Sequence, residues 1–262
     1  MIELPYVEQG DATGIPVVML HGVTDSWRSF EHVLPHLPDD IRAVAVTQRG
    51  HGEAPKPESG YLIEDLAGDV VDLLDELGIE RAIVVGHSMG SWVTQRVAID
   101  HPERVSGVVL AGSFNGRPGA DPAMQAFAAE MAAVRDPVPD EVARDFQEST
   151  IACPLPPGQI DEFVLESLKV PARVWSQAFT GFLEIDLAEG LAQLAAPAML
   201  VWGEEDAFIP RAIQDELLEA IPDARLEVYQ GVGHAVHWEQ PLRFARDVAA
   251  FSRYSAGLQL SR

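Results

Sequence analysis

The sequence predicts an α/β fold in which a mostly parallel central sheet is flanked by helices. Three observations support this prediction. Short apolar segments alternate with helical patterns of about 10–15 residues, which is typical of βαβ units. One apolar segment ends in Gly86-x-Ser88-x-Gly90, directly before a helical pattern. The length of 262 residues fits one domain with a sizeable core.

The expected strands are short runs of apolar, mostly β-branched residues. They are residues 2–7 (a weakly alternating edge strand), 17–20, 41–46, 82–85, 105–111, 198–203 and 225–229. The expected helices run from Ser26 through Leu37, over 62–77, after Ser88, after Pro210 and over about 241–254, with a loose tail beyond. Helix 62–77 has one apolar face. We expect its acidic residues to form the solvated side: Asp65, Asp69, Asp72, Asp75 and Glu76.

The composition is that of a soluble globular protein, with 47% hydrophobic and 23% charged residues. The formal net charge of −23 argues against nucleic acid and anionic membranes as partners. It also predicts repulsion of highly anionic substrates unless a local basic residue counters it. Residues 1–5 lack the basic and apolar regions of an export signal. Cys153 is the only cysteine, so no intrachain disulfide can form, and we expect a cytoplasmic protein.

The stretch around Ser88 predicts a nucleophile on a sharp turn between a strand and a helix. Such a turn strains the serine backbone, and Gly86 and Gly90 lack side chains so that strand and helix can approach closely. The turn lifts the hydroxyl out of the sheet and points the helix N-terminus at any negative charge beside it. His87 either lines the floor of the site or packs behind the turn.

Ser88, Asp206 and His234 each follow a predicted strand, and ligands of open parallel sheets bind at the carboxyl ends of the strands. A serine hydroxyl needs a base to remove its proton during attack. An imidazole in turn needs a carboxylate to hold its tautomer. These three residues therefore predict a catalytic triad.

The order serine, acid, histidine resembles that of the α/β-hydrolase superfamily. The loops that carry the acid and the histidine resemble the family's G-x-x-D and G-x-G-H-x-x-x-x-E-x-P motifs. They are present as Gly203-Glu204-Glu205-Asp206 and as Gly231-Val232-Gly233-His234, with Glu239 and Pro241. The resemblance covers essentially the whole chain apart from residues 115–196.

This resemblance implies an oxyanion hole made of backbone N–H groups. The family takes one donor from an HG-type turn, present here as His21-Gly22-Val23, and one from the residue after the nucleophile. It therefore implies the N–H groups of Val23 and Met89. His21 itself is expected to be a structural residue of the turn. The run 47–52 resembles the family's D-x-R-G-x-G turn, with Gln48 where Asp often stands; this departure concerns a structural turn.

Residues 115–196 contain helical stretches and prolines but no convincing buried strand. The resemblance implies that they form a helical cap, inserted after the sixth core strand between core segments 1–114 and 197–262. Most aromatic residues of the cap are expected to pack internally, while one face looks down on Ser88. Trp175 and Phe179, together with Phe208 of the core, are our candidates for substrate contacts.

Each choice in the triad has a competitor. His237 lies three residues after His234, but His234 directly follows the Gly-x-Gly turn. Glu204 and Glu205 are read as solvated loop carboxylates because Asp206 holds the motif position. No pattern with the spacing of a zinc site, a P-loop or a dinucleotide fingerprint is present, so we expect neither a metal nor a cofactor.

The resulting hypothesis is a serine hydrolase that cleaves an apolar, small-molecule carboxylic ester or lactone through an acyl-enzyme. A carbon–carbon bond hydrolase or a perhydrolase would use the same triad, and fold and triad do not decide among these reactions. A non-catalytic ligand-binding protein of the same fold is a further alternative. The intact triad favours catalysis over binding alone.

Overall fold

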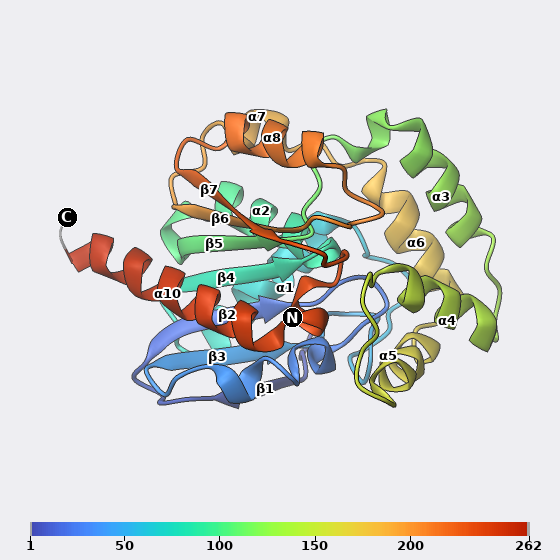
Figure 1. Ribbon diagram of the computed structural model, residues 1–262, viewed down its shortest axis with the longest axis horizontal. Coiled ribbons are helices and arrows are strands. Elements are labelled where there is room, and N and C mark those ends of the chain that lie inside the picture. Colours follow the sequence, from blue (N-terminus) through green and yellow to red (C-terminus); the bar gives the residue numbers. More distant parts are fainter. Residues whose placement is uncertain (1, 261–262) are drawn as a thin grey trace.

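The computed structural model describes residues 2–260 and contains a seven-stranded sheet in the order β1-β3-β2-β4-β5-β6-β7 (Figure 1). β1 pairs antiparallel with β3, and all other neighbouring strands are parallel. The strands are β1 (Tyr6–Gln9), β2 (Ile15–Leu20), β3 (Ile41–Val46), β4 (Ala82–His87), β5 (Val105–Ala111), β6 (Ala198–Gly203) and β7 (Ala224–Tyr229). The predicted fold class is confirmed.

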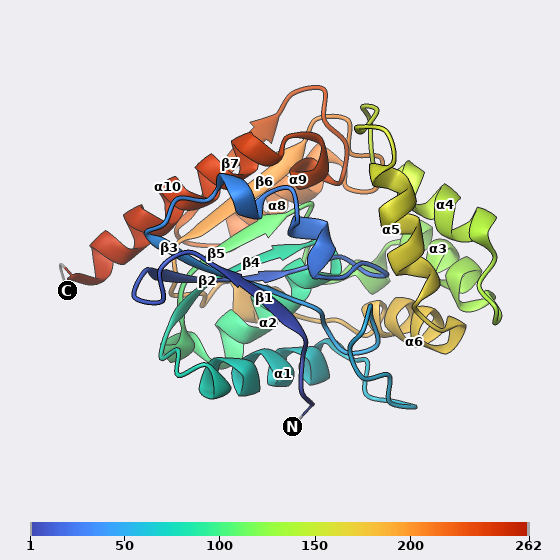
Figure 2. The same cartoon turned by 90° about the horizontal axis from the view of Figure 1, so that it is seen from below.

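Alternate residues of the central strands supply two hydrophobic cores, one on each face of the sheet. On β4, Val84 belongs to the core that α1 (Ile63–Glu76) and α2 (Met89–Asp100) cover. Its neighbours Ile83 and Val85 belong to the core that α10 (Pro241–Leu260) covers. Figure 2 shows α1 and α2 on one side of the sheet and α10 on the other. Because both faces are covered, these strands are apolar throughout rather than alternating.

Two chain ends differ from the prediction. β1 begins at Tyr6 instead of residue 2, because Pro5 has no N–H to donate to the ladder and the pairing with β3 starts at Tyr6. α10 continues to Leu260, so the loose tail expected after residue 254 is wrong as far as residue 260. Ser255 is buried against the sheet and its hydroxyl donates to the carbonyl of Ser106, which holds this part of the helix. Residues 261–262 lie outside the described chain.

The single helix expected after Ser26 is wrong. The chain forms two short 3₁₀ segments instead, η1 (Trp27–Phe30) and η2 (Leu34–His36). Ser26 caps the first, since its hydroxyl accepts a hydrogen bond from the N–H of Arg28 at 3.2 Å. Pro35 has no N–H with which to continue a longer helix, and it lies in the first turn of the second segment, which begins at Leu34.

Within the described residues, the segment between β5 and β6 contains helices and no strand. These are η4 (Pro118–Ala120), α3 (Pro122–Ala132), α4 (Asp140–Ser149), α5 (Gln159–Leu168), α6 (Ala172–Phe182) and α7 (Ala188–Leu191). Helices α3 to α6 lie together at the carboxyl ends of the strands (Figure 1). The segment follows the fifth strand in chain order and not the sixth, since the strands that precede it are β1 to β5. The division into a core and a cap of residues 115–196 stays a prediction; we call α3 to α6 the cap helices.

The remaining helices lie outside the segment between β5 and β6. They are η3 (Pro102–Arg104), which precedes β5, and α8 (Arg211–Ala220) and α9 (Val236–Glu239), which follow β6 and β7. Leu217 of α8 packs in the same core as α1 and α2, and Val236 of α9 packs in the core below α10.

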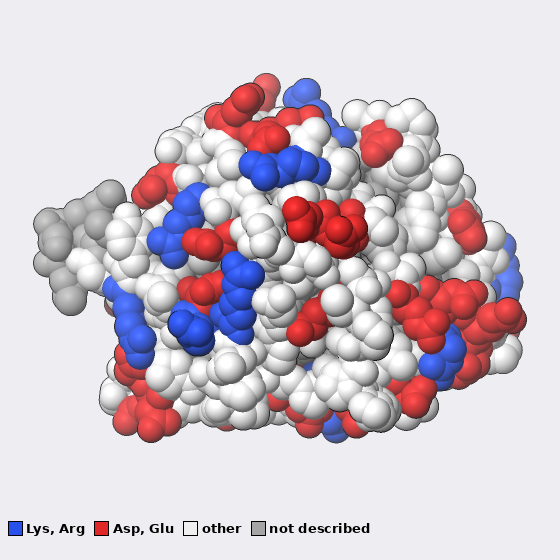
Figure 3. Space-filling model, in the orientation of Figure 1, with Lys and Arg blue, Asp and Glu red and all other residues white. Residues whose placement is uncertain are grey.

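Acidic side chains gather over the outer face of α4 and α5 (Figure 3). Arg144 is surrounded there by carboxylates, with Asp161 at 2.8 Å and Glu148 at 3.6 Å. Exposed pairs of this kind add little stability. These carboxylates contribute to the net charge of −23. They give the end of the molecule that carries the cap helices a negative electrostatic potential.

Asp69 does not lie on a solvated face of α1, as we expected from the helical pattern. Its side chain is buried, and both of its carboxylate oxygens accept hydrogen bonds from the guanidinium of Arg49. Arg49 also donates to the carbonyl of Gly60 at 2.8 Å. The helical spacing gave no sign of this pair, because the partner comes from the turn after β3.

Replacing Asp69 by Ala leaves the Arg49 guanidinium without its partner in a mostly buried position. We expect the free energy of unfolding to fall by about 3 kcal/mol, measured by urea denaturation. Asp72→Ala is the matched control, because Asp72 lies half-buried on the same helix and forms no ion pair among the described residues. A loss no larger than that of the control would show that the Arg49–Asp69 pair does not stabilise the fold.

Candidate active site

Ser88 lies at the turn from β4 into α2 with a strained backbone, at φ 50° and ψ −116°. The turn fits only glycine on either side. A β-carbon on Gly86 would lie 2.1 Å from the carbonyl oxygen of Gly90, and one on Gly90 would lie 2.2 Å from the carbonyl oxygen of Leu20. The N–H of Ser88 donates to Ala111 of β5 at 3.0 Å. The sheet therefore holds Ser88 from both sides in a conformation that non-glycine residues rarely adopt.

His234 and Asp206 form a buried pair at the ends of β7 and β6. The Nδ1 atom of His234 lies 2.8 Å from Oδ2 of Asp206, and the two side chains are 5% and 0% exposed. The other carboxylate oxygen, Oδ1, accepts the N–H groups of Phe208 and Ile209, both at 2.9 Å. The carboxylate is thus fixed by its own loop. Donation from Nδ1–H leaves Nε2 of His234 as the basic nitrogen.

Glu239 anchors the loop that carries His234. Its Oε1 accepts the N–H of Gly233 at 2.7 Å and that of Ala152 at 3.2 Å, and its Oε2 accepts the N–H of Cys153 at 2.8 Å. One carboxylate therefore joins the histidine loop to the segment between α4 and α5. Glu239 is the glutamate of the sequence motif around His234, and in the structure it holds this loop in place.

The competing residues lie in other surroundings. Glu204 and Glu205 are exposed. His237 is buried in α9, where its Nε2 lies 2.8 Å from the hydroxyl of Ser29, and burial lowers its pKa to about 3. Within residues 2–260, His234 is the one buried histidine in an ion pair with a carboxylate.

His21 is placed as a structural residue, in agreement with the expectation from the sequence. Its Nε2 accepts the N–H of Gln48 at 3.0 Å, so its Nδ1–H donates to the carbonyl of Gly22 at 2.7 Å. Burial holds its pKa well below the ordinary value, with His51 acting in the same direction. The neutral ring ties the turn after β2 to the turn after β3.

The two candidate oxyanion donors flank Ser88. Val23 lies on the wall of the cavity that contains Ser88 and His234. Its N–H donates to no backbone carbonyl in the described chain. Met89 is the first residue of α2, where an N–H has no acceptor inside the helix. Both donors are thus unengaged by the backbone, and their role as an oxyanion hole stays a prediction.

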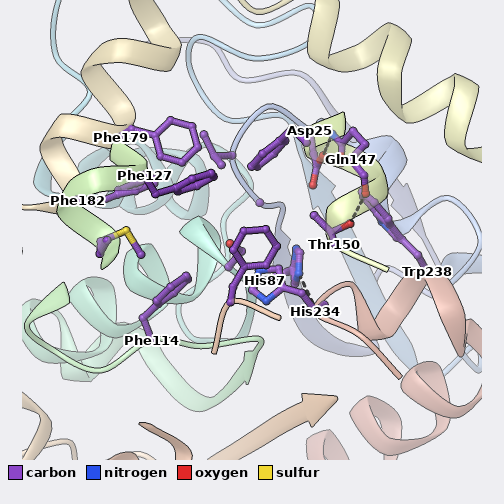
Figure 4. A pocket seen from close by; sticks show the side chains of 16 residues that line it. Asp25, His87, Phe114, Phe127, Gln147, Thr150, Phe179, Phe182, His234 and Trp238 are labelled. Carbon is purple, nitrogen blue, oxygen red and sulfur yellow. Dashed lines mark hydrogen bonds between the residues drawn. The ribbon is translucent and has the colours of Figure 1, made fainter. Parts of the chain in front are cut away.

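A cavity of about 40 Å³ opens between the cap helices and the ends of the strands. Its wall is formed by Gly22, Val23, Asp25, His87, Ser88, Phe114, Met124, Phe127, Phe146, Gln147, Thr150, Phe179, Phe182, Phe208, His234 and Trp238. Figure 4 shows phenylalanines on one side of His87 and His234, and Asp25, Gln147, Thr150 and Trp238 on the other. The cavity is therefore apolar at one end and hydrogen-bonding at the other.

Two of the three candidate substrate contacts, Phe179 and Phe208, lie on this wall, whereas Trp175 does not. Trp175 is fully buried behind it and packs edge-on against Phe146, with ring centroids 5.5 Å apart. The apolar face of α6 is wide enough to reach both the cavity and the interior of the cap. Helical spacing alone does not show which of its residues reach the cavity and which pack inside the cap. His87, for which two placements were open, lines the cavity.

The polar wall of the cavity was not predicted from the sequence. Asp25 lies two residues after Val23, close enough to the predicted turn to have been considered. Gln147 and Thr150 lie on or beside a polar helix and have no local pattern that distinguishes them from surface residues.

Asp25 is a buried carboxyl without a cationic partner among the described residues. Its Oδ1 accepts from Nε2 of Gln147 at 2.9 Å, and its Oδ2 from the hydroxyl of Ser29 at 3.4 Å. Burial raises the pKa of Asp25 to about 7, while the hydrogen bonds from Gln147 and Ser29 oppose the rise and the carboxylate of Glu166 adds to it. This carboxyl therefore keeps its proton to a higher pH than an exposed aspartate does.

Within the described residues, no group of three or more His, Cys, Asp or Glu side chains is arranged to hold a metal ion. No described helix has the length and apolar character needed to cross a membrane.

The strand order, the strained turn at Ser88 and the pairing of His234 with Asp206 together define a class of protein. Residues 15–241 match the family described as alpha/beta hydrolase fold, and the chain belongs to this family. The proteins that are similar to this chain include several kinds of hydrolase. Family membership and these relatives support hydrolase activity.

Three comparisons illustrate the range. A thermophilic esterase from Thermogutta terrifontis has a similar structure, with a TM-score of 0.87 and 25% identity over 97% of this chain and 94% of that one. The esterase RhEst1 from a Rhodococcus species has a TM-score of 0.83 and 28% identity over 96% and 95%. A 2-hydroxy-6-oxononadienedioate/2-hydroxy-6-oxononatrienedioate hydrolase from Cupriavidus pinatubonensis is 28% identical over 247 residues, 90% of this chain and 86% of that protein.

The raised pKa of Asp25 predicts a pH-dependent stability. Because the pKa in the folded protein, about 7, exceeds the ordinary value of 3.8, the folded state holds the proton more tightly. The resulting stabilisation is lost as the pH rises from about 4 to about 7. Asp25→Asn resembles the protonated carboxyl and lacks this loss. We expect its melting temperature, relative to wild type, to be higher at about pH 8 than at about pH 5.

The control is Asp39→Asn, which removes an exposed carboxylate and should shift the melting temperature equally at both pH values. A difference between Asp25→Asn and wild type that is the same at both pH values would mean that Asp25 is already ionised at the lower one.

Proposed function

We propose that this chain is a serine hydrolase that cleaves neutral carboxylic esters, lactones included, through an acyl-enzyme on Ser88. The observation that carries the proposal is the hydrogen bond between His234 Nδ1 and Asp206, beside the cavity onto which the strained Ser88 opens. In this tautomer, Nε2 of His234 is the base that a serine hydroxyl needs. The esterases among the structural neighbours support the same chemistry.

The first half of the reaction forms the acyl-enzyme. The hydroxyl oxygen of Ser88 attacks the ester carbonyl carbon while its proton passes to Nε2 of His234. Asp206 stabilises the imidazolium that results. The carbonyl oxygen becomes an oxyanion, which the N–H groups of Val23 and Met89 bind; such a donor is typically worth about 2.7–4 kcal/mol. Collapse breaks the bond to the leaving alcohol, which takes the proton from His234.

The second half returns the free enzyme. A water molecule gives a proton to Nε2 of His234 and attacks the acyl carbon. The second tetrahedral intermediate uses the same two N–H groups. When it collapses, the bond to Ser88 breaks and the serine oxygen takes the proton back, releasing a carboxylic acid.

The charges around the cavity support a neutral substrate. Its wall contains no lysine or arginine among the described residues, and it contains the buried carboxyl of Asp25. A substrate carboxylate placed there would lose its hydration without gaining a cationic partner. The relative from Cupriavidus pinatubonensis is named for a dienedioate substrate, which carries two carboxylates. The carbon–carbon alternative with such a dianion is therefore disfavoured here.

Loss of activity in Ser88→Ala tests the nucleophile. With 4-nitrophenyl butyrate we expect a burst of nitrophenol in wild type and a fall in kcat of about 1000-fold or more in the variant. A fluorophosphonate probe should label wild type and not Ser88→Ala. His234→Gln should lose activity to a similar extent, whereas His237→Gln should stay within about tenfold of wild type. Undiminished turnover in Ser88→Ala would exclude this mechanism.

The preference for neutral esters is testable with one matched pair of substrates. Mono-4-nitrophenyl glutarate carries a terminal carboxylate, and its methyl ester is a neutral analogue with the same acyl chain. We expect kcat/KM for the neutral analogue to be at least about 100-fold higher, because a buried, unpaired carboxylate costs several kcal/mol. Repeating the assay at high salt separates long-range repulsion, which salt screens, from desolvation. Equal rates on the two esters would contradict the proposed substrate class.

A further inference from the structure

Thr24 has a backbone conformation that its side chain disfavours. Its φ is 70°, and Ser88 is the other non-glycine residue with positive φ within residues 2–260. A β-branched residue in this region costs about 1–3 kcal/mol and persists only where the surroundings fix it. Thr24 directly follows Val23, whose N–H is the proposed oxyanion donor. The strained residue therefore adjoins the residue that carries the proposed donor.

The groups that fix Thr24 come from the cap helices. The hydroxyl of Ser167, on α5, donates to Oγ1 of Thr24 at 3.1 Å. Nε2 of Gln147, on α4, lies 3.3 Å from the same oxygen and 2.7 Å from Oγ of Ser167. It also donates to Oδ1 of Asp25 at 2.9 Å (Figure 4). We refer to Thr24, Asp25, Gln147 and Ser167 as the turn–cap cluster.

The cluster is buried throughout, with exposed fractions of 0% for Thr24 and Ser167, 1% for Gln147 and 4% for Asp25. Hydrogen bonds in such surroundings are not replaced by water, so losing one leaves a polar atom unpaired. The core holds the neighbouring parts of the turn: the carbonyl of Gly22 accepts from Nδ1 of His21 at 2.7 Å and from the N–H of Asp25 at 3.3 Å, and Ser29 reaches Asp25 at 3.4 Å. Within the described chain, the hydrogen bonds of the Thr24 side chain go to α4 and α5.

We infer that Gln147 and Ser167 are positioning residues, which hold Thr24 in its left-handed conformation and thereby direct the Val23 N–H at the substrate oxyanion. This inference rests on the proposed function. It assigns the cap helices a part in transition-state stabilisation in addition to covering the cavity.

Ser167 and Thr24 allow a clean test because neither lies on the cavity wall, so neither contacts the substrate. Ser167→Ala and Thr24→Val each remove one hydroxyl of the cluster. Loss of a complete oxyanion donor lowers kcat by about 100- to 1000-fold. A donor that is misdirected but present should lower kcat by about 10- to 100-fold, with KM within about threefold of wild type.

A transition-state analogue supplies a second readout. A trifluoromethyl ketone forms a tetrahedral adduct on serine, so its affinity should fall by the same factor as kcat/KM in both variants. Thr24→Ser keeps the hydroxyl and should recover most of the kcat that Thr24→Val loses. The matched control is Ser149→Ala, which removes an exposed hydroxyl at the end of α4 and should have wild-type kinetics. Thermal unfolding identifies any variant that has lost its fold. If Thr24→Val does not fold, the kinetics of Ser167→Ala decide.

The outcomes separate the two proposals. Folded Ser167→Ala with kcat within twofold of wild type overturns the turn–cap inference, and so does a rise in KM with unchanged kcat, which would mean that the cluster only shapes the cavity. Both results leave the serine-hydrolase proposal standing. Wild-type protein that neither cleaves esters nor reacts at Ser88 with a fluorophosphonate overturns the proposed function, and this inference with it.

Discussion

The site depends on the close approach of three backbone segments around Ser88. β4 enters the turn, α2 leaves it, and the end of β2 lies against Gly90 with no space for a β-carbon. This contact places the N-terminus of α2 next to the turn that follows β2. The two candidate oxyanion donors, Val23 and Met89, come from these two segments. Contact between these segments thus brings the candidate nucleophile, Ser88, and both candidate donors together, and the parallel register of the sheet adds the ends of β6 and β7.

The cavity above this contact differs in chemistry from one end to the other. Phenylalanines of α3 and α6 form one end, and the other carries hydrogen-bonding groups from the turn and from α4. The buried histidines nearby are kept neutral by burial, so His21, His87 and His237 add no positive charge. The wall therefore carries the carboxyl of Asp25 and, among the described residues, no lysine or arginine.

The sequence predicted the features that depend on local signals. Apolar runs located the seven strands, and motif position led to Asp206 and His234, which the structure places 2.8 Å apart. It failed where a distant segment decides. Asp69 has the spacing of a surface residue, but Arg49 covers it. Gln147 belongs to a polar helix, but its partners Thr24 and Asp25 lie more than 100 residues earlier. Pro35 is a local signal against a single long helix after Ser26, and the prediction of that helix did not take it into account. The separation of Trp175 from the cavity depends on packing inside the cap, which periodicity does not encode.

Glu239 binds the segment after α4 through the main-chain N–H groups of two successive residues, Ala152 and Cys153. Because every residue except proline has an N–H, the identities of residues 152 and 153 matter little for this attachment. What matters is their position, since Pro154 follows immediately and has no N–H to offer. A deletion that moved the chain by one residue would place this proline where Glu239 needs a donor. The link between α4 and the histidine loop therefore tolerates substitutions but fixes the length of the chain, which allows cap sequences to diverge while their attachment stays the same.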